Sequence, residues 1–426
     1  MPAAAHDILD RVRRAGVGGK GPDGEDGPVV LELDLTEPLL AAPASDPVEA
    51  VRSRRRLTLA GVLDGLRRAS DDRDVAGIVV QIGGTPCGLA TAQELRAAVA
   101  AFRATGRFAV AWSVTFGEFG AGTPGYYLAT VFDEIWLQES GDVGLIGVAG
   151  QVLFLHDALD RAGIDAQVGQ RHEYKNAANM FTRTGFTEPH REAVGAIVDS
   201  FAAQLVDAVG TARGLRPDRV RELVDASPLT AADAHAAGLI DRVGYRDEVY
   251  DAVRERAGGA AALLFLARYR PSRVEAVSSR IIRRKDPQIA LIYGIGTIRT
   301  GRTVRSPLGG PSMGSDTIGA ALRAAVEDDD VVAIVLRVDS PGGSYVASDS
   351  VRREVLRARA ADKPVIVSMG EVAGSGGYFI AMAADVIVAN PATITGSIGV
   401  LGGKAVVERL LDRVGIGVDA VAHGAR

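Results

Sequence analysis

The residues of this 426-residue chain that could do covalent chemistry centre on Ser375. This serine lies in a Gly-Ser-Gly-Gly segment between an apolar stretch at 363–369, typical of a buried strand, and another at 377–384, typical of a core helix. A serine at such a junction lies beside the free N–H groups of the helix N-terminus, which suits a nucleophile whose acyl adduct carries an oxyanion. The same residues are also typical of a tight turn with a serine N-cap. The segment alone leaves both interpretations open.

A serine nucleophile needs a base, and the chain offers histidine or lysine. A Ser-His-Asp triad has poor candidates, because His423 lies near the chain end and His235 lies in an Ala-rich helical segment. The segment is also not the GxSxG of an α/β-hydrolase, since Ala373 stands two residues before Ser375. Lys175 is the alternative, because it lies among small and apolar residues, where burial can lower the pKa of its amine. By itself, a single lysine is also typical of an exposed surface.

A long internal duplication is the main architectural feature of the sequence. Strands alternate with helices in both copies, which predicts βαβ units around parallel sheets. The first copy carries Pro124 at the position that matches Ser375, and it lacks the Pro-Gly-Gly loop at 339–343. The second copy therefore offers the nucleophile, while Lys175 belongs to the first. The matching segments are 74–82 and 330–338, 107–112 and 363–368, 127–137 and 378–388, and 144–148 and 396–400.

The duplication predicts four parts of the chain. Residues 1–27 are rich in glycine and predict a flexible N-terminus, and residues 28–249 form the first repeat. Residues 250–286 predict a linker helix, apolar around Leu263 to Leu266 and followed by basic residues. Residues 287–426 form the second repeat. Since the first repeat continues beyond the last matching segments, we expect the second to be truncated at the C-terminus.

Composition excludes several classes of function. The net charge is −5 with both signs interspersed, which argues against a nucleic-acid surface. The chain has one cysteine and no metal-like spacing of histidines, so we expect no disulfide framework, no metal site and no cofactor. No stretch of about 18 apolar residues and no secretory signal are visible. These features predict a cytoplasmic protein or one peripheral at the membrane.

Five motifs in one order resemble the signal peptide peptidase A family, in its long tandem form, also called protease IV. The resemblance covers roughly residues 29–426. It implies an α/β fold of tandem duplicated ClpP/crotonase-like domains, built of repeated ββα and βαβ units with linking helices. It also implies a serine peptidase with a Ser-Lys dyad. The motifs are Asp72–Val79, Tyr174-Lys175, Asp339–Gly343, Ala373–Tyr378 and Ala389–Val400.

The resemblance implies a role for each of five residues. Ser375 would attack the scissile carbonyl, and Lys175 would act as general base and later protonate the leaving amine. Ser397 resembles the hydroxyl that orients the lysine amine. The backbone N–H groups of Gly343 and Gly376 would form the oxyanion hole. The Pro-Gly-Gly loop suits that role, because glycine lets the backbone approach a ligand closely.

The resemblance further implies peptide substrates, namely cleaved signal peptides or other unfolded apolar peptides. Family members assemble into rings or bowls, so we expect a homo-oligomer such as a tetramer, and Lys175 could meet Ser375 within one chain or across an interface. The long form usually begins with a membrane anchor, which is not visible here, and peripheral membrane association stays possible. Two other functions stay open: a crotonase-type acyl-CoA enzyme, with Glu371 and Asp339 as its nearest acidic groups, and a non-catalytic scaffold or pseudoprotease.

Overall fold

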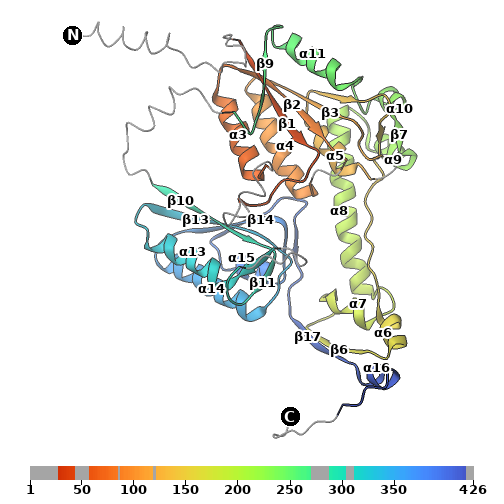
Figure 1. Ribbon diagram of the computed structural model, residues 1–426, viewed down its shortest axis with the longest axis vertical. Helices are drawn as coiled ribbons and strands as arrows, with labels where there is room; N and C mark the ends of the chain where they lie inside the picture. Colours follow the sequence, from red (N-terminus) through yellow and green to blue (C-terminus); the bar gives the residue numbers. More distant parts are fainter. Residues whose placement is uncertain are drawn as a thin grey trace, which may run out of the picture.

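The protein is an α/β structure with two parallel sheets, one in each half of the chain (Figure 1). The computed structural model describes residues 27–43, 57–84, 87–118, 121–269, 287–303 and 311–418. The predicted flexible N-terminus therefore lies outside the described residues, apart from Gly27. The last part of the predicted linker helix, residues 270–286, also lies outside them.

The first sheet has six strands in the order β8-β4-β3-β2-β1-β9, and all neighbours are parallel. Its strands form because continuous apolar runs are buried on both faces, as in β3, where all six residues are buried. Helices α3, α4 and α5 connect the strands, and α11 lies over the other face. The elements are β1 (Val29–Leu35), α3 (Leu59–Asp71), β2 (Val75–Ile82), α4 (Leu89–Ala104), β3 (Phe108–Ser113), α5 (Thr123–Ala129), β4 (Glu134–Leu137), β8 (Arg242–Val243), α11 (Arg246–Arg256) and β9 (Ala262–Phe265).

The second sheet has the strand order β10-β13-β14-β15, and β16 pairs with the C-terminal part of β14. Helices α13 and α14 pack on one face through buried aliphatic residues. The small ladder between β11 and β12 lies at the end of β10. The elements are β10 (Gln288–Ile295), β11 (Thr297–Arg299), β12 (Ser312–Gly314), α13 (Ser315–Glu327), β13 (Val331–Ser340), α14 (Tyr345–Ala360), β14 (Val365–Gly374), α15 (Gly376–Ala381), β15 (Val386–Val388) and β16 (Ile394–Gly396).

The two sheets carry the same ion pair at the same place, in agreement with the predicted duplication. Arg103 Nε donates to Asp133 over 2.8 Å in the first sheet, and Arg359 Nε donates to Asp385 over 2.7 Å in the second. Arg103 lies near the C-terminal end of α4, and Arg359 lies near the C-terminal end of α14. Each aspartate also accepts a hydrogen bond from a backbone N–H at the start of β3 or β14. The shared contacts fix how helix and strand pack in both repeats.

The predicted apolar helix around Leu263 to Leu266 is wrong. Residues 262–265 form β9, which pairs in parallel with β1 at the edge of the first sheet. A four-residue apolar run does not distinguish a strand from a buried helix, and here the open edge of β1 supplies hydrogen-bond partners. Leu266, which is buried, packs against Gly65 of α3 at the end of this strand.

An extended arm joins the two repeats (Figure 1). Strand β6 of the first repeat pairs antiparallel with β17 of the second, from Asp165↔Val406 to Gln170↔Leu401. Helix α6 contacts α16 through an ion pair of Asp160 with Arg409. The remaining elements are β5 (Asp142–Val143), α6 (His156–Ala162), β6 (Asp165–Gln170), η1 (Asn176–Ala178), α7 (Asn179–Thr182), α8 (Glu188–Arg213), α9 (Pro217–Ala226), β7 (Leu229–Thr230), α10 (Ala231–Ala236), β17 (Leu401–Val406) and α16 (Glu408–Arg413).

Helix α8 runs from this arm back to the first sheet (Figure 1). Among the described residues it is the one helix long and apolar enough to cross a membrane, judged by length and composition alone. Its most apolar 18-residue stretch is 11% buried, so most of it faces solvent here. Its C-terminal part packs on the first sheet through Leu205 and Val209.

The packing of α13 predicts a clear difference between two truncations in the second repeat. Leu322→Ala removes a fully buried side chain from the core, so we expect a loss of about 3 kcal/mol in the free energy of unfolding. Val332→Ala removes a side chain that is 49% exposed on β13 and should change it by less than about 0.5 kcal/mol. Chemical denaturation of both variants checks this, and equal losses would contradict the core assignment.

Candidate active site

Ser375 occupies a strained junction between β14 and α15. It is the N-cap residue of α15, with φ 52° and ψ −112°, a region that residues other than glycine rarely adopt. Its N–H donates to Gly396 O over 2.8 Å, which ties the junction to β16. Its side chain makes no capping hydrogen bond. The interpretation of Ser375 as a capping serine in a simple turn is therefore wrong.

The amine of Lys175 lies at Ser375 within the same chain. Lys175 Nζ is 2.9 Å from Ser375 Oγ, 2.6 Å from Ser397 O and 3.2 Å from Ser397 Oγ. The lysine is 4% exposed, and burial lowers the pKa of its amine below the ordinary lysine value. No ion pair joins it to a carboxylate among the described residues. The amine thus has three oxygen partners and no counter-charge.

The arm explains how a lysine of the first repeat reaches a serine of the second. The β6–β17 ladder continues past its last pair, because Arg171 N–H donates to Val400 O over 3.0 Å. Lys175 follows at the N-cap of η1, facing the segment that contains Ser397. Gly399, at φ 118°, packs beside it, and a Cβ there would lie 3.8 Å from Lys175 Cδ. Backbone pairing between the repeats therefore delivers the amine.

The Pro-Gly-Gly loop lies directly against Ser375. Gly342 has φ 101°, and a Cβ on it would lie 2.8 Å from both Ser375 Cβ and Gly376 N. Ile298 of β11 holds the loop, because its N–H donates to Gly342 O over 2.9 Å. Among the described residues, no hydrogen bond is formed by the N–H of Gly343 or of Gly376. Both backbone donors that the sequence singled out are thus unused, one on the loop and one at the start of α15.

The structural register of the two repeats differs by one residue from the sequence match. The C-cap residues of α5 and α15, Thr130 and Met382, correspond and are 252 positions apart. This puts Thr123, and not Pro124, opposite Ser375. The placement of Pro124 opposite Ser375 is therefore wrong. Two consecutive tyrosines in the middle of α5, Tyr126 and Tyr127, permit either register in the sequence.

The corrected register places Pro124 opposite Gly376, at the first turn of each helix. A proline has no N–H, so the first repeat lacks the backbone donor that Gly376 offers. Thr123 keeps a hydroxyl, but this side chain is buried and donates a long hydrogen bond of 3.4 Å to Gly147 O. At the position that matches Gly376, the first repeat therefore has no backbone N–H donor.

Among the described residues, no histidine side chain is hydrogen-bonded to Ser375, Lys175 or Ser397. His190 is buried beside Phe154 and Phe186, and its Nδ1 lies 3.4 Å from Asn179 Nδ2. His235 contacts a backbone carbonyl over 3.1 Å. His423 lies outside the described residues. No group of three or more metal-binding side chains occurs among the residues that the structure describes.

Sequence reasoning missed one polar contact that the structure makes close to Ser375. Glu371, four residues before the serine on β14, accepts hydrogen bonds from the N–H groups of Ala90 and Thr91 at the start of α4. The signal was a charged residue inside an otherwise apolar strand. Its partner, 281 residues away along the chain, could not be identified from local pattern.

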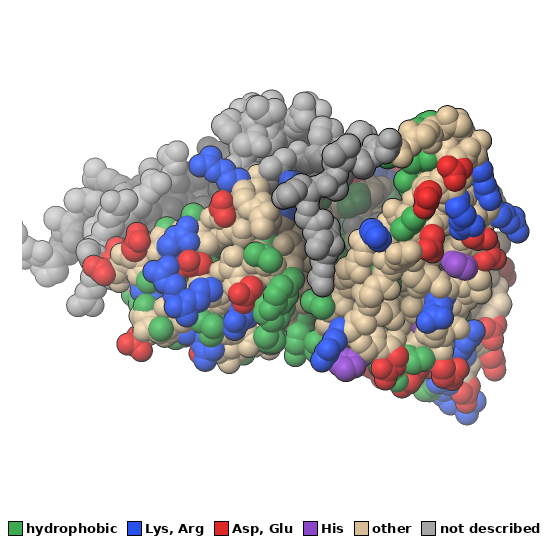
Figure 2. All heavy atoms as spheres, turned by 90° about the horizontal axis from the view of Figure 1, so that it is seen from below, with side chains coloured by type: hydrophobic (Ala, Val, Ile, Leu, Met, Phe, Trp, Pro, Cys, Tyr) green, Lys and Arg blue, Asp and Glu red, His purple; other side chains and the backbone are tan. Residues whose placement is uncertain are grey.

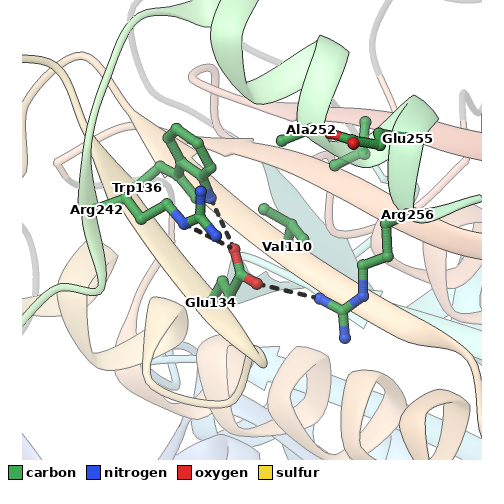
Figure 3. A pocket seen from close by; sticks show the side chains of 8 residues that line it. Val110, Glu134, Trp136, Arg242, Ala252, Glu255 and Arg256 are labelled. Carbon is green, nitrogen blue, oxygen red and sulfur yellow. Dashed lines mark hydrogen bonds and ion pairs between the residues drawn. The ribbon is translucent and has the colours of Figure 1, made fainter.

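A separate cavity of about 300 Å³ lies between β4 and α11, far from Ser375 in the chain and on the opposite face of the first sheet from α4 (Figure 3). Glu134 lies between two arginines there, 3.4 Å from Arg256 and 3.8 Å from Arg242, and accepts a hydrogen bond from Trp136 Nε1. Glu255 also lines this cavity, so two carboxylates face two guanidinium groups and the charges of the lining cancel. None of the lining residues is a serine, threonine, cysteine or lysine that could act as a nucleophile.

Comparison with known families agrees with this geometry. The family model for peptidase family S49 matches residues 113–259 and 357–425, about half of the chain, including Lys175 and Ser375. This chain belongs to peptidase family S49. The S49 assignment and the two parallel sheets confirm the predicted ClpP/crotonase-like fold class and the resemblance to the signal peptide peptidase A family.

Three S49 relatives are similar over 86% of this chain. The chloroplastic serine protease SPPA of Arabidopsis thaliana is 30% identical, with 54% of its own length covered. Protease 4 of Salmonella typhi is 32% identical, with 58% covered. Protease 4 of Haemophilus influenzae is 29% identical, with 60% covered. The chain thus spans between half and three fifths of the length of these relatives.

The contact between Gly342 and Ser375 predicts how a methyl group would act. Gly342→Ala should slow reaction of Ser375 with a fluorophosphonate on the order of 100-fold, because the new Cβ would displace the serine or the N–H of Gly376. Gly301→Ala introduces the same strain at φ 87° with no atom within 4 Å, and it should leave the reaction unchanged. Mass spectrometry measures the labelling rate. Equal slowing in both variants would assign the effect to backbone strain alone.

Proposed function

We propose that the chain is a serine peptidase of the Ser-Lys type, which hydrolyses peptide bonds through an acyl-enzyme. The observation that carries this proposal is the buried, carboxylate-free amine of Lys175 at 2.9 Å from Ser375 Oγ. Membership of peptidase family S49 supports it. Residues 28–249 supply the base and residues 287–426 supply the nucleophile, so the two proposed repeats divide the work.

The hydrogen-bond partners of Lys175 support the role of general base. A neutral amine has two N–H donors and one lone pair. The carbonyl of Ser397 can only accept, and its hydroxyl can accept, so these oxygens take the two N–H groups. The lone pair is then left for the hydroxyl hydrogen of Ser375, which is the arrangement that proton abstraction requires. Ser397 thereby orients the lysine.

The reaction then follows from the positions of the remaining groups. Ser375 Oγ attacks the peptide carbonyl as its proton passes to Lys175 Nζ. The negative charge on the carbonyl oxygen is met by the N–H groups of Gly343 and Gly376. Lys175 gives its proton to the leaving amine, and the acyl group stays on Ser375. Lys175 then takes a proton from water, whose oxygen attacks the acyl carbon. The bond from that carbon to Ser375 Oγ breaks, Lys175 returns the proton to Oγ, and the acid product leaves.

Unfolded apolar peptides, such as cleaved signal peptides, are the substrates that we propose. Exposed apolar side chains adjoin each part of the site in the sequence: Tyr345 and Val346 follow the glycine loop, Met382 ends α15 and Ile398 follows Ser397, with exposed fractions of 49% to 71%. Figure 2 shows hydrophobic side chains gathered near the middle of the lower face. Such a surface favours apolar peptides over charged ones.

The assembly and location of the protein are part of the same proposal. Lys175 and Ser375 form their hydrogen bond within one chain, which supports a site that acts in cis. A homo-oligomer such as a tetramer, and a cytoplasmic or peripheral membrane location, are proposed from the family. The exposed apolar surface of α8 supports association with a membrane or with another subunit.

The acyl-CoA alternative is less well supported. Its nearest acidic groups would be Glu371 and Asp339. The first accepts hydrogen bonds from the N-terminus of α4, and the second accepts one from Val372 N–H over 3.1 Å. Both carboxylates are therefore engaged in structural contacts. A non-catalytic scaffold would give no reason for an amine without a counter-charge to be buried at a serine.

Removal of either dyad member should abolish turnover. We expect Ser375→Ala, Lys175→Ala and Lys175→Arg each to lower kcat/KM for an apolar peptide by roughly 10⁴-fold, because a guanidinium stays charged and cannot accept the proton. Lys404→Ala, at an exposed position of β17, should retain full activity. An active Lys175→Arg enzyme would exclude the lysine as base. Circular dichroism confirms that each variant is folded.

The pH dependence should report the titration of Lys175. The amine must be neutral to act, and burial lowers its pKa, so kcat/KM should rise with pH along a limb whose midpoint lies below the ordinary lysine pKa. The same shift makes the folded state less stable at pH values where the amine is charged. Lys175→Met should therefore raise the melting temperature at neutral pH but not above the lysine pKa of the unfolded chain. A limb at or above the ordinary lysine pKa would contradict this account.

A further inference from the structure

The N-terminus of helix α4, in the first repeat, contacts β14, the strand of the second repeat that precedes Ser375. Helix α4 begins at Leu89, and its N-cap residue, Gly88, has no side chain that could accept hydrogen bonds from the first turn. The carboxylate of Glu371 fills that role. It accepts from Thr91 N–H over 2.7 Å and from Ala90 N–H over 3.2 Å. A negative charge at a helix N-terminus is also favoured by the helix dipole.

The backbone of Gly88 lies very close to the carboxylate of Glu371. A Cβ on Gly88 would lie 2.4 Å from Glu371 Cδ, so any side chain at this position must push the carboxylate away from the helix. Helix α4 itself is fixed in the first repeat, since Leu95, Val99 and Phe102 are buried in its core. Glu371 thus ties the second repeat to a rigid part of the first.

Two further contacts along α4 continue this interface. Glu94 pairs with Arg337 of β13 over 2.5 Å, and both side chains are less than one fifth exposed. Gln93 Oε1 accepts from the N–H of Ala392 over 3.0 Å, in the loop that leads into β16 and then to Ser397. The same helix therefore holds the strand that ends at Ser375 and the loop that ends at Ser397.

Glu371 lies four residues before Ser375 on one continuous strand, β14. The pairing of β14 with β13 is irregular between Met369 and Ala373, around Glu371. Beyond it, Val372, Ala373 and Gly374 pair with β16, so a shift at Glu371 would reach Ser375 through three paired residues. Lys175 reaches the site by the separate route of the arm. The distance between Ser375 Oγ and Lys175 Nζ is thus set by two independent contacts between the repeats, the arm and α4.

We propose that Glu371 is a positioning residue, which by capping α4 across the repeat boundary sets Ser375 in register with Lys175. This inference rests on the proposed Ser-Lys function. Glu371 does not touch the reacting atoms. It acts through the placement of Ser375, so its loss should disturb the rate and the titration of the dyad together.

The test is the rate of labelling of Ser375 by a fluorophosphonate, measured against pH in the whole chain. Glu371→Ala should slow labelling at neutral pH on the order of 10-fold to 100-fold, since misplacement by about 1 Å has effects of this size. The pH at which the labelling rate rises should also move toward the ordinary lysine pKa, because a displaced second repeat buries Lys175 less. Glu371→Gln retains one acceptor oxygen and should recover part of the rate.

Gly88→Ala tests the same contact from the first repeat. Its φ of −72° suits alanine, so the backbone is unstrained, while the new methyl group displaces Glu371. It should reproduce the slower labelling and the shifted limb, and it decides the matter if Glu371→Ala does not fold. Glu354→Ala is the matched control, because it removes a carboxylate that pairs with Arg323 and Arg357 on the outer helices, away from α4. It should label like the unaltered protein.

Three outcomes overturn the inference while leaving the proposed function intact: labelling of Glu371→Ala and Gly88→Ala at the unaltered rate, slower labelling with an unmoved pH limb, or equal slowing in Glu354→Ala. An unaltered protein whose Ser375 does not react at any pH refutes the proposed function itself. The two failures are therefore distinguishable in one experiment.

Discussion

A buried amine with three oxygens around it and no carboxylate is the feature on which the arrangement of this protein depends. Taking the charged form of Lys175 out of water is costly, and only the carbonyl and hydroxyl of Ser397 and the hydroxyl of Ser375 compensate it. Those oxygens must be held in place before the amine arrives, because a loose site would admit water and restore the ordinary pKa. The strained backbone of Ser375 and Ser397, both at positive φ, reflects that rigidity.

The amine of Lys175 and the hydroxyl of Ser375 come from different repeats, so the two copies of the fold contribute different groups to one site. Each repeat has a short helix, α5 or α15, in the matching place, and the first residue of α15, Gly376, has a free N–H. Pro124 removes that donor from the first repeat. The first repeat instead extends into the arm, which carries the lysine. One fold thus holds Ser375 in one copy and delivers the amine of Lys175 from the other.

Much of this arrangement could be predicted from the sequence, and the limits have physical causes. Ser375, Lys175 and Ser397 were singled out by glycine-rich junctions and ordered motifs, and the structure brings the three together, while their catalytic roles stay predictions. Short-range ambiguity caused the errors: a tyrosine doublet allowed two registers at Pro124, and a four-residue apolar run at 262–265 suited helix and strand equally. Contacts such as that of Glu371 with α4 depend on packing between distant segments, which no local periodicity encodes.

The exposed two-stranded ribbon of β6 and β17 also has a consequence for biosynthesis. Such a ribbon is marginal without its partner strand, and β17 is made more than 200 residues after β6 begins. A growing chain therefore carries Lys175 on an unpaired segment until the second repeat has emerged. Since Ser375 also precedes β17, the lysine and the serine stay apart during most of synthesis. The contact between Lys175 and Ser375 therefore forms only after the segments that build the ribbon have both been synthesised.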